Sequence, residues 1–295
     1  MSAAKRRLFF ILIGMLAGLA AWPVAEATLY FQRHFPTYFT FSVVLGGMFG
    51  LIMGAINGGS DGIVLYSRRR MTMGMLGGAL IGCAGGLLGF LLAQFLLLFL
   101  GEYFIHSIIA FDTVGLPIAR AVGWACLGVF IGMIDGVRTR SLSRMRMGML
   151  GGLLGGLAGG FLLEYLRLLL PIIALARLVG LLLLGGCIGL CYGFVEWRLS
   201  YGSLVLLNGK HKGQTFLLNQ RSVLIGLSGK SDIVLRDYDR VGADHAEVRF
   251  MDDELVLRPR NGKAVYANDE PVRAHILKFE DVIKIGTARL LYRFR

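Results

Sequence analysis

Apolar residues dominate the first 200 positions of the chain, and charged residues become frequent only after them. Six apolar stretches can be marked in this region, each of about 20 residues or more, which is the length that an α-helix needs to cross a bilayer. The predicted spans are 8–30, 38–58, 71–100, 116–136, 147–170 and 172–195. The third is long enough to tilt or to extend beyond the hydrocarbon. The pattern therefore predicts an α-helical membrane domain over 1–200.

The first span has a feature of secretory signal peptides, because Lys5, Arg6 and Arg7 precede it. Its apolar stretch is rather long for a signal peptide, although several alanines near its end resemble a cleavage site. Five further spans follow it. We therefore interpret it as an uncleaved first transmembrane helix.

From Tyr201 onward the pattern changes to short alternating runs separated by turn signals such as Asn208-Gly209 and Asn261-Gly262. Many short strands at regular spacing are typical of a β-sandwich. The nine runs are SLVLLN, QTFLLN, SVLIG, DIVLRD, AEVRF, ELVLRP, KAVYAN, DVIKIG and RLLYRF. No run in this region has a helical period, so we expect an all-β domain over 201–295.

Lysine and arginine in the short loops predict the orientation of the spans. Clusters lie before span one (5–7), between spans two and three (68–70), between spans four and five (138–146) and after span six (Arg198). These loops alternate, so all fall on one side of the membrane. We expect both termini and the β-domain to be cytoplasmic. The net charge of +12 then reflects topology and contact with anionic lipid, and it is weak evidence for nucleic-acid binding.

The membrane domain contains an internal repeat. RMTMGMLGGALIGCAGG, which begins at Arg70, matches RMRMGMLGGLLGGLAGG, which begins at Arg144, without a gap at an offset of 144 − 70 = 74 residues. The preceding segment GLIMGAING from Gly50 resembles GVFIGMIDG from Gly128, and GGCIGLCYG in the last span has similar spacing. Both copies start on the same side, so the sequence predicts a parallel repeat of a helix pair.

Glycines recur every fourth residue in these helices and form flat stripes. Because no water drives helices together in lipid, close backbone contact must hold them, and small residues permit it. We interpret the stripes as packing surfaces within one chain or between chains, which leaves a homo-oligomer open. The packing glycines are Gly50, Gly54, Gly58, Gly78, Gly82, Gly86, Gly128, Gly132, Gly136, Gly152, Gly156, Gly160, Gly185, Gly189 and Gly193.

Few polar residues fall inside the spans, and the centres of the spans are apolar. Asp61 and Asp135 lie near the predicted cytoplasmic ends, and Glu164, Arg167 and Arg177 lie near the outer ends. Glu164 and Arg167 have the spacing of a same-face pair. Arg177 is expected either to extend outward or to pair with Glu164. A transporter or channel usually places polar groups at mid-membrane, so this alternative is less favoured.

No catalytic, metal or cofactor site is predicted. The cysteines Cys83, Cys126, Cys187 and Cys191 all fall within spans, where small packed residues are the simplest interpretation. The histidines of the β-domain have no nearby cysteine or nucleophile. The glycine patterns lie in apolar helices and do not form a phosphate-binding loop with a lysine. We therefore expect that the protein is not an enzyme.

The β-domain resembles the forkhead-associated (FHA) family. The segments SVLIGLSGKSDIVLRDYDRVGADHAEVRF and NGKAVYANDEPVRAHILKFEDVIKIGTARLLYRF follow its order of a strand with Gly-Arg, Asp-Ile, Val-Ser-x-x-His-Ala, an Asn-Gly-Thr turn, Val-Asn-Gly and Ile-x-Ile-Gly. The resemblance covers about a third of the chain. It implies an eleven-strand sandwich whose loops at one end bind phosphothreonine peptides.

The residues that would bind phosphate are absent. Gly226 matches the glycine of Gly-Arg, but Leu227 replaces the arginine, a charge-assisted donor for which leucine cannot substitute. Gly242 replaces the phosphate-binding serine. His245 matches the histidine that braces the loops. The resemblance further implies that Asn261 holds the backbone of a bound peptide and that Asn268 is structural.

We interpret these loops as a site for a cytosolic protein, phosphorylated or not, with ordinary phosphothreonine recognition disfavoured. Lys230, Ser231, Arg236 and Arg240 are the residues that would rebuild a phosphate pocket, and they are otherwise solvated surface residues. The sequence predicts a membrane-anchored interaction platform in a plasma membrane of the bacterial type. Two alternatives stay open, namely a small transporter or channel regulated by the FHA-like domain and a structural part of a secretion or envelope assembly.

Overall fold

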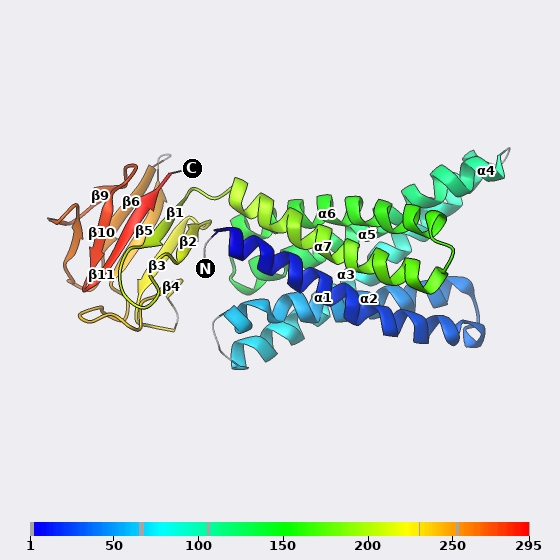
Figure 1. Ribbon diagram of the computed structural model, residues 1–295, viewed down its shortest axis with the longest axis horizontal. Helices are drawn as coiled ribbons and strands as arrows, with labels where there is room; N and C mark the ends of the chain where they lie inside the picture. Colours follow the sequence, from blue (N-terminus) through cyan, green and yellow to red (C-terminus); the bar gives the residue numbers. More distant parts are fainter. Residues whose placement is uncertain (1–2, 65–67, 105–106, 230, 252–253, 295) are drawn as a thin grey trace. The chain divides into compact units, whose positions relative to one another are not determined.

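A computed structural model describes residues 3–64, 68–104, 107–229, 231–251 and 254–294. It contains two compact units, a helical unit that comprises residues 7–196 and a β-unit that contains residues 197–295 (Figure 1). Lys230 and the side chain of Asp61 lie outside the described part.

The helical unit consists of six long apolar helices that lie side by side (Figure 1). Each is long and apolar enough to cross a membrane, as the hydropathy pattern predicts. A short helix α4 (Ile108–Ala110) and a π-helical turn η2 (Phe111–Gly115) lead into α5, and the sequence pattern did not predict them. A short 3₁₀ turn, η1 (Gln32–His34), follows the first helix. The long helices are α1 (Ala3–Tyr30), α2 (Tyr38–Val64), α3 (Arg68–Tyr103), α5 (Leu116–Arg138), α6 (Leu142–Leu169) and α7 (Ile173–Arg198).

Local signals in the sequence explain where some of these helices begin and end. Ser141 caps α6, because its hydroxyl accepts a hydrogen bond from the amide of Arg144. Pro117 stands in the first turn of α5 directly after the π-helical turn η2, where its missing N–H accompanies an interruption of the regular α-helical hydrogen bonding. Pro171 follows α6, which it cannot continue. The interior is filled by buried apolar side chains, among them Met53, Leu127 and Leu184.

The β-unit is a mainly antiparallel sandwich of two sheets with eleven strands in the described residues, in which β3 and β4 form a parallel pair. One sheet has the order β2-β1-β11-β10-β7-β8, and the other has the order β4-β3-β5-β6-β9. The strands are β1 (Gly202–Leu206), β2 (Thr215–Leu218), β3 (Ser222–Gly226), β4 (Ile233–Val234), β5 (Ala246–Met251), β6 (Glu254–Pro259), β7 (Val265–Ala267), β8 (Glu270–Val272), β9 (His275–Ile276), β10 (Val282–Ile285) and β11 (Ala288–Arg293).

The alternation of apolar and polar residues explains the core of the sandwich. In β1, Gly202, Leu204 and Leu206 are buried, and the residues between them are partly exposed. The inner faces of both sheets contribute to one core that includes Ile225, Leu257, Ile283 and Leu290. The six helices followed by an FHA-like sandwich thus agree with the fold class that the sequence predicts.

Candidate functional site: the loop end of the sandwich and the polar and glycine contacts of the helices

The end of β3 is joined closely to the loop that precedes β5. The amide of Leu227 donates to the carbonyl of Gly242 at 2.9 Å, and the amide of Ser228 donates to that of Ala243 at 3.0 Å. A Cβ added at Gly226 would overlap the carbonyl oxygen of Ala243. Glycine at position 226 therefore lets the two segments approach within hydrogen-bond distance.

His245 holds several segments together at this end. Its Nδ1 accepts a hydrogen bond from the amide of Gly242 at 3.0 Å, and its Nε2 lies 3.0 Å from the carbonyl of Ala264. Nε2 therefore carries the proton and donates to Ala264. The side chain is almost fully buried, at 2% exposure. This geometry makes His245 a brace for the loops and leaves it no capacity to bind a ligand.

The two positions that would contact phosphate in the FHA pattern carry no donor side chain. Leu227 is 36% exposed at the surface. A Cβ at Gly242 would meet the aliphatic side chain of Lys263 at 3.4 Å, so Lys263 lies across this position. Sequence reasoning missed Lys263, although it stands where the family pattern Asn-Gly-Thr has threonine. Among the described residues, Lys263 therefore places a cationic side chain beside the position of the missing serine.

The remaining candidate residues are placed as follows. Ser231 is buried and donates to the carbonyl of Ala243 at 3.2 Å, so it supports the loop and does not face solvent. Asn261 is exposed, adopts a positive φ of 53°, and donates to the carbonyl of Asp244 at 3.2 Å. Arg236 and Arg240 are exposed, and within the described residues their side chains make no hydrogen bond or ion pair.

Asn268 does not lie with these loops. Asn261 precedes β7, whereas Asn268 follows it at the opposite end of the strand. There Asn268 donates to Asp281 Oδ1 at 2.8 Å and accepts from the amide of Val282 at 2.9 Å. Its assignment to the partner-binding loops is therefore wrong, while its expected structural role fits these contacts.

Asp281 is the centre of this second network. Its Oδ2 accepts from the amide of Lys278 at 2.7 Å and lies 2.8 Å from His275 Nε2. Burial tends to raise the pKa of Asp281, but the hydrogen bonds from Lys278, Asn268 and His275 together hold this pKa below its ordinary value. The carboxylate is thus stabilised in its charged form.

In the helical unit, glycines of neighbouring helices face each other. A Cβ at Gly50, Gly54 or Gly58 would overlap the carbonyl oxygens of Gly82, Gly78 and Gly74, respectively. These contacts join α2 to α3. In the corresponding contacts between α5 and α6, Gly128 and Gly132 face the carbonyls of Gly152 and Gly148. The other predicted packing glycines contact backbone as well: Gly86 meets Gly46, Gly136 meets Met145, Gly156 meets Trp124, Gly160 meets Ala121, Gly185 meets Gly14 and Gly189 meets Phe10. Gly193 has only ordinary contacts, the nearest at 3.5 Å.

These contacts correct the alignment of the first helix in each pair. Gly62 packs on the Cα of Met71, and Gly136 packs in the same way on that of Met145. Both residues of the contact shift by 74 positions, since 136 − 62 = 74 and 145 − 71 = 74. The structural counterpart of Gly54 is then Gly128, and Gly50 corresponds to Trp124. The predicted alignment of the two repeats, in which Gly50 was equivalent to Gly128, is therefore wrong by one helical turn.

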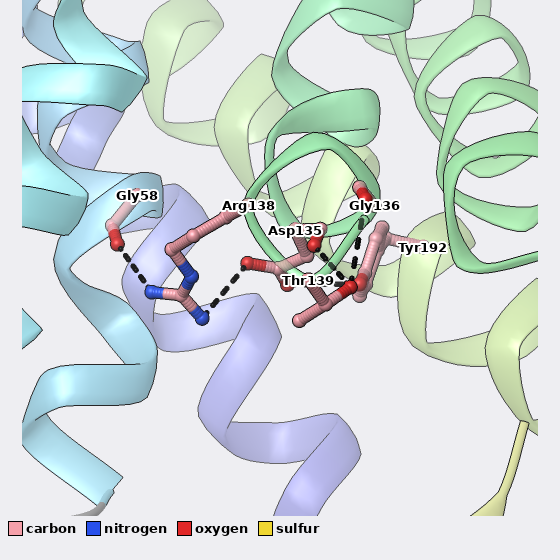
Figure 2. Close-up of polar contacts among 6 residues, drawn as sticks. All are labelled: Gly58, Asp135, Gly136, Arg138, Thr139 and Tyr192. Carbon is pink, nitrogen blue, oxygen red and sulfur yellow. Dashed lines mark hydrogen bonds and ion pairs between the residues drawn. The ribbon is translucent and has the colours of Figure 1, made fainter. Parts of the chain in front are cut away.

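A polar cluster joins α2, α5 and α7 at the end of the bundle where α5 joins α6 (Figure 2). Tyr192 donates from its hydroxyl to Asp135 Oδ2 at 2.9 Å, and Arg138 Nη2 lies 3.7 Å from Asp135 Oδ1. Arg138 also donates from Nη1 to the carbonyl of Gly58 at 3.3 Å. Thr139 closes the turn through its hydroxyl, which donates to the carbonyl of Asp135 at 2.7 Å. These bonds tie three helices together.

At the opposite end of the bundle, ion pairs join helices that are distant in sequence. Arg177 binds Glu26 with two hydrogen bonds, from Nε at 2.6 Å and from Nη2 at 2.7 Å. The expected pairing of Arg177 with Glu164 is therefore wrong. Glu164 instead accepts from Arg120 at 2.8 Å and lies 3.5 Å from Arg167. Arg120 was missed because it is a single cation inside an apolar span.

Within the part of the chain that the structure describes, no group of three or more histidine, cysteine, aspartate or glutamate side chains is arranged to hold a metal ion.

Comparisons with known proteins concern the β-unit. A sequence family described as "Inner membrane component of T3SS, cytoplasmic domain" (Yop-YscD) matches residues 205–294, which is less than half of the chain. No curated protein sequence matches the chain.

Three solved structures illustrate the likeness. The FHA domain of FhaA, solved in complex with the intracellular domain of Rv3910, is 27% identical over 31% of this chain and 99% of that domain, with a TM-score of 0.29. The FHA domain of the CT664 protein from Chlamydia trachomatis is 20% identical over 32% and 97%, with a TM-score of 0.30. The N-terminal FHA domain of S. cerevisiae Rad53p, in complex with a phosphothreonine peptide, is 14% identical over 32% and 94%, also with a TM-score of 0.30. The chain thus combines six membrane-type helices with a β-sandwich that, over residues 205–294, is similar to the cytoplasmic domain of an inner-membrane component of a secretion system.

Proposed function

We propose that the protein is a membrane-anchored interaction platform whose FHA-like sandwich binds a partner protein through its loop end without ordinary phosphothreonine recognition. The observation that carries this proposal is the contrast at that end. Gly226 and His245 keep the contacts that shape the loops, whereas Leu227 and Gly242 offer no donor for phosphate. A maintained surface without its phosphate ligands is suited to an unphosphorylated protein segment.

The family match supports a place in a membrane assembly. The matching family is described as the cytoplasmic domain of an inner-membrane component. The arginine clusters at alternate loops support the same orientation here, with both termini and the sandwich in the cytoplasm. We therefore place the platform in the inner membrane, where the helices fix the position of the sandwich. Self-association and contact with anionic lipid stay predictions.

The arrangement of the bundle interior disfavours a conducting path. Polar side chains gather toward both ends, around Asp135 at one end and Glu164 at the other. Met53, Leu127 and Leu184 occupy intermediate positions on α2, α5 and α7 and are fully buried. A transporter that opens this layer would have to separate tightly packed glycine contacts. The platform is thus the better supported function.

Site-specific crosslinking in the full chain tests the proposal. A photoreactive amino acid replaces Leu227 at the loop end or, as a matched control, Met251 at the far end of β5, because both residues are apolar and 36% exposed. Membranes from the native host are irradiated after half of each sample has been treated with phosphatase. We expect a protein adduct at 227 that is absent at 251 and is unaffected by phosphatase.

Two outcomes would contradict the proposal. An adduct that vanishes with phosphatase would show that cations such as Lys263, Arg236 or Arg240 have rebuilt a phosphate pocket. Equal adducts at both positions, or none at 227, would show that the loop end is not the binding surface.

Restoring the missing ligands provides the complementary test. Leu227→Arg combined with Gly242→Ser is expected to create a preference of about tenfold or more for phosphothreonine peptides over their unphosphorylated forms, because arginine supplies charge-assisted donors. Leu227→Gln combined with Gly242→Ser is the matched control without the charge. The readout is the fluorescence polarisation of labelled peptides with the full-length protein in detergent. If the double variant shows no preference, the loops do not have the FHA geometry that the proposal assumes.

A further inference from the structure

A cavity of about 340 Å³ lies inside the helical unit at the end where α6 joins α7. All six long helices contribute to its wall, from Ala25 on α1 to Leu181 on α7. Its volume falls within the range of small-molecule sites, about 300–1,000 Å³. The FHA-like domain takes no part in it, so its occupant is independent of the function proposed above.

One part of the wall is cationic. Arg120 and Arg167 both approach the same oxygen, Glu164 Oε2, at 2.8 and 3.5 Å. The charge of this group is therefore +2 − 1 = +1, because one carboxylate faces two guanidinium groups. The side chain of Glu164 is only 5% exposed, whereas those of Arg120 and Arg167 are 25% and 42% exposed, so the two guanidinium groups are accessible to a ligand.

These guanidinium groups retain capacity to donate. A guanidinium has five N–H donors. Among the described residues, Arg120 makes one side-chain hydrogen bond, to Glu164, and Arg167 makes only the longer ion pair. Arg177, which also lines the cavity, differs because Glu26 already binds it with two hydrogen bonds. An anion beside Arg120 and Arg167 would neutralise the excess charge and accept from their remaining donors.

The rest of the wall is apolar and aromatic. Phe49, Phe90 and Trp124 pack against one another with ring centroids 5.3–6.0 Å apart. Phe41 and Leu45 continue this surface. Such a wall suits an alkyl chain and gives a free inorganic anion nothing to bind. The two parts together match a molecule with an anionic head and an apolar tail.

We propose that this cavity binds an anionic phospholipid, with its phosphate between Arg120 and Arg167 and part of an acyl chain against Phe49, Phe90 and Trp124. The remainder of the lipid extends into the bilayer. The site is distinct from the basic loops at the other end of the bundle, for which the sequence predicts contact with anionic lipid through exposed charges.

Native mass spectrometry of the full chain in a neutral detergent tests the proposal. Phosphatidylglycerol is titrated against phosphatidylcholine with the same acyl chains, and inorganic phosphate is added as a competitor. We expect one phosphatidylglycerol to bind about tenfold or more tightly than phosphatidylcholine, and millimolar phosphate to leave it bound. Arg167→Gln is expected to weaken the lipid about tenfold. Glu164→Gln, which removes the competing carboxylate, is expected to strengthen it severalfold.

Two further variants make the result specific. Arg33→Gln removes the same charge from the exposed η1 turn at the same end of the bundle, outside the cavity wall, and should change nothing. Leu45→Trp fills the cavity without altering its charges and should weaken the lipid, which keeps the test decisive if an arginine variant fails to fold. Equal binding of the two lipids, equal losses in Arg33→Gln and Arg167→Gln, or displacement by phosphate with no effect of Leu45→Trp would each overturn the proposal.

Discussion

The helical unit and the sandwich each bury a large apolar interior, but different interactions stabilise the packing within each unit. In the helices, glycine brings backbone against backbone, so that many contacts leave no room for a single added methyl group. In the sandwich, large apolar side chains fill the core, and polar side chains such as Asp281 and His245 fix the turns. The first arrangement is sensitive to added volume, and the second is sensitive to the loss of a hydrogen-bond partner.

Adding one methyl group to a packed glycine should break this pattern most severely. Gly82→Ala would place a Cβ against the carbonyl of Gly50 and 2.8 Å from the Cα of Gly54. Because both are backbone atoms, the helices must separate, and we expect a loss of about 3 kcal/mol or more of stability. Thermal unfolding in detergent, followed by size-exclusion chromatography, measures it.

Gly77→Ala is the matched control for this change. It lies on the same helix α3, and an added Cβ meets no atom within 4 Å. Both substitutions raise the helix propensity equally, so the difference between them isolates packing. Equal stability of the two variants would contradict the packing role of the glycine stripe.

Removing the carboxylate of Asp281 should have the largest effect on the turns of the sandwich. Asp281→Ala leaves the amide of Lys278 and the side chain of Asn268 without their acceptor. We expect a loss of about 2–4 kcal/mol, since these donors lose a charged partner that is itself buried. Hydrogen exchange of peptides from residues 203–294 in the full-length protein measures this loss.

Asp237→Ala is the control for this variant. Asp237 also pairs with a histidine, His211, at 2.8 Å, but both side chains are about half exposed. Such exposed pairs contribute about 1 kcal/mol or less. A protection loss in Asp237→Ala as large as that in Asp281→Ala would refute the proposed importance of the buried network.

We also expect Asp281 to make the stability of the sandwich, and not that of the helical unit, depend on pH. Its pKa in the folded protein lies below the ordinary value of 3.8, because the hydrogen bonds outweigh the effect of burial. The unfolded chain therefore binds the proton first as the pH falls. The stabilisation is complete above the ordinary carboxyl pKa and is lost as the pH falls through the lower, folded value. The neighbouring His275 is the other titratable group in the network.

Asp281→Asn tests this dependence. We expect its stability curve below about pH 5 to be flatter than that of the parent protein, with the difference vanishing at the acid end. Hydrogen exchange of the peptide around 278–285, corrected for the intrinsic exchange rate at each pH, provides the measurement. Parallel curves for the two proteins would show that Asp281 does not carry the dependence.

The sequence predicts different features well in the two units. The six helices follow from the length of the apolar stretches, because the bilayer sets that length. Their register does not follow, since a glycine every fourth residue permits pairings one turn apart, and the alignment of Gly50 with Gly128 was wrong for this reason. Ion-pair partners such as Glu26 of Arg177 depend on the tertiary arrangement of helices and have no local signal.

In the sandwich, the nine strand runs were found by their alternation, whereas β8 and β9 were missed. These two strands have three and two residues, and β8 contains Pro271, so neither shows a period. The loop scaffold at Gly226 and His245 was recognised from motif order. Lys263 was missed because its closeness to Gly242 arises from the packing of two loops that are distant in the sequence.

The smallest expected effect concerns the polar cluster of the helices, where a hydrogen bond and not a methyl group is changed. Tyr192→Phe removes the hydroxyl that donates to Asp135 but keeps the ring, which packs edge-on to Phe10 at 4.9 Å. We expect a loss of about 1 kcal/mol, and Tyr165→Phe, at an exposed tyrosine of α6, should show none. Thermal unfolding in detergent separates these cases. A loss in Tyr192→Phe as large as that in Gly82→Ala would mean that polar bonds, and not close glycine contacts, govern the stability of the bundle.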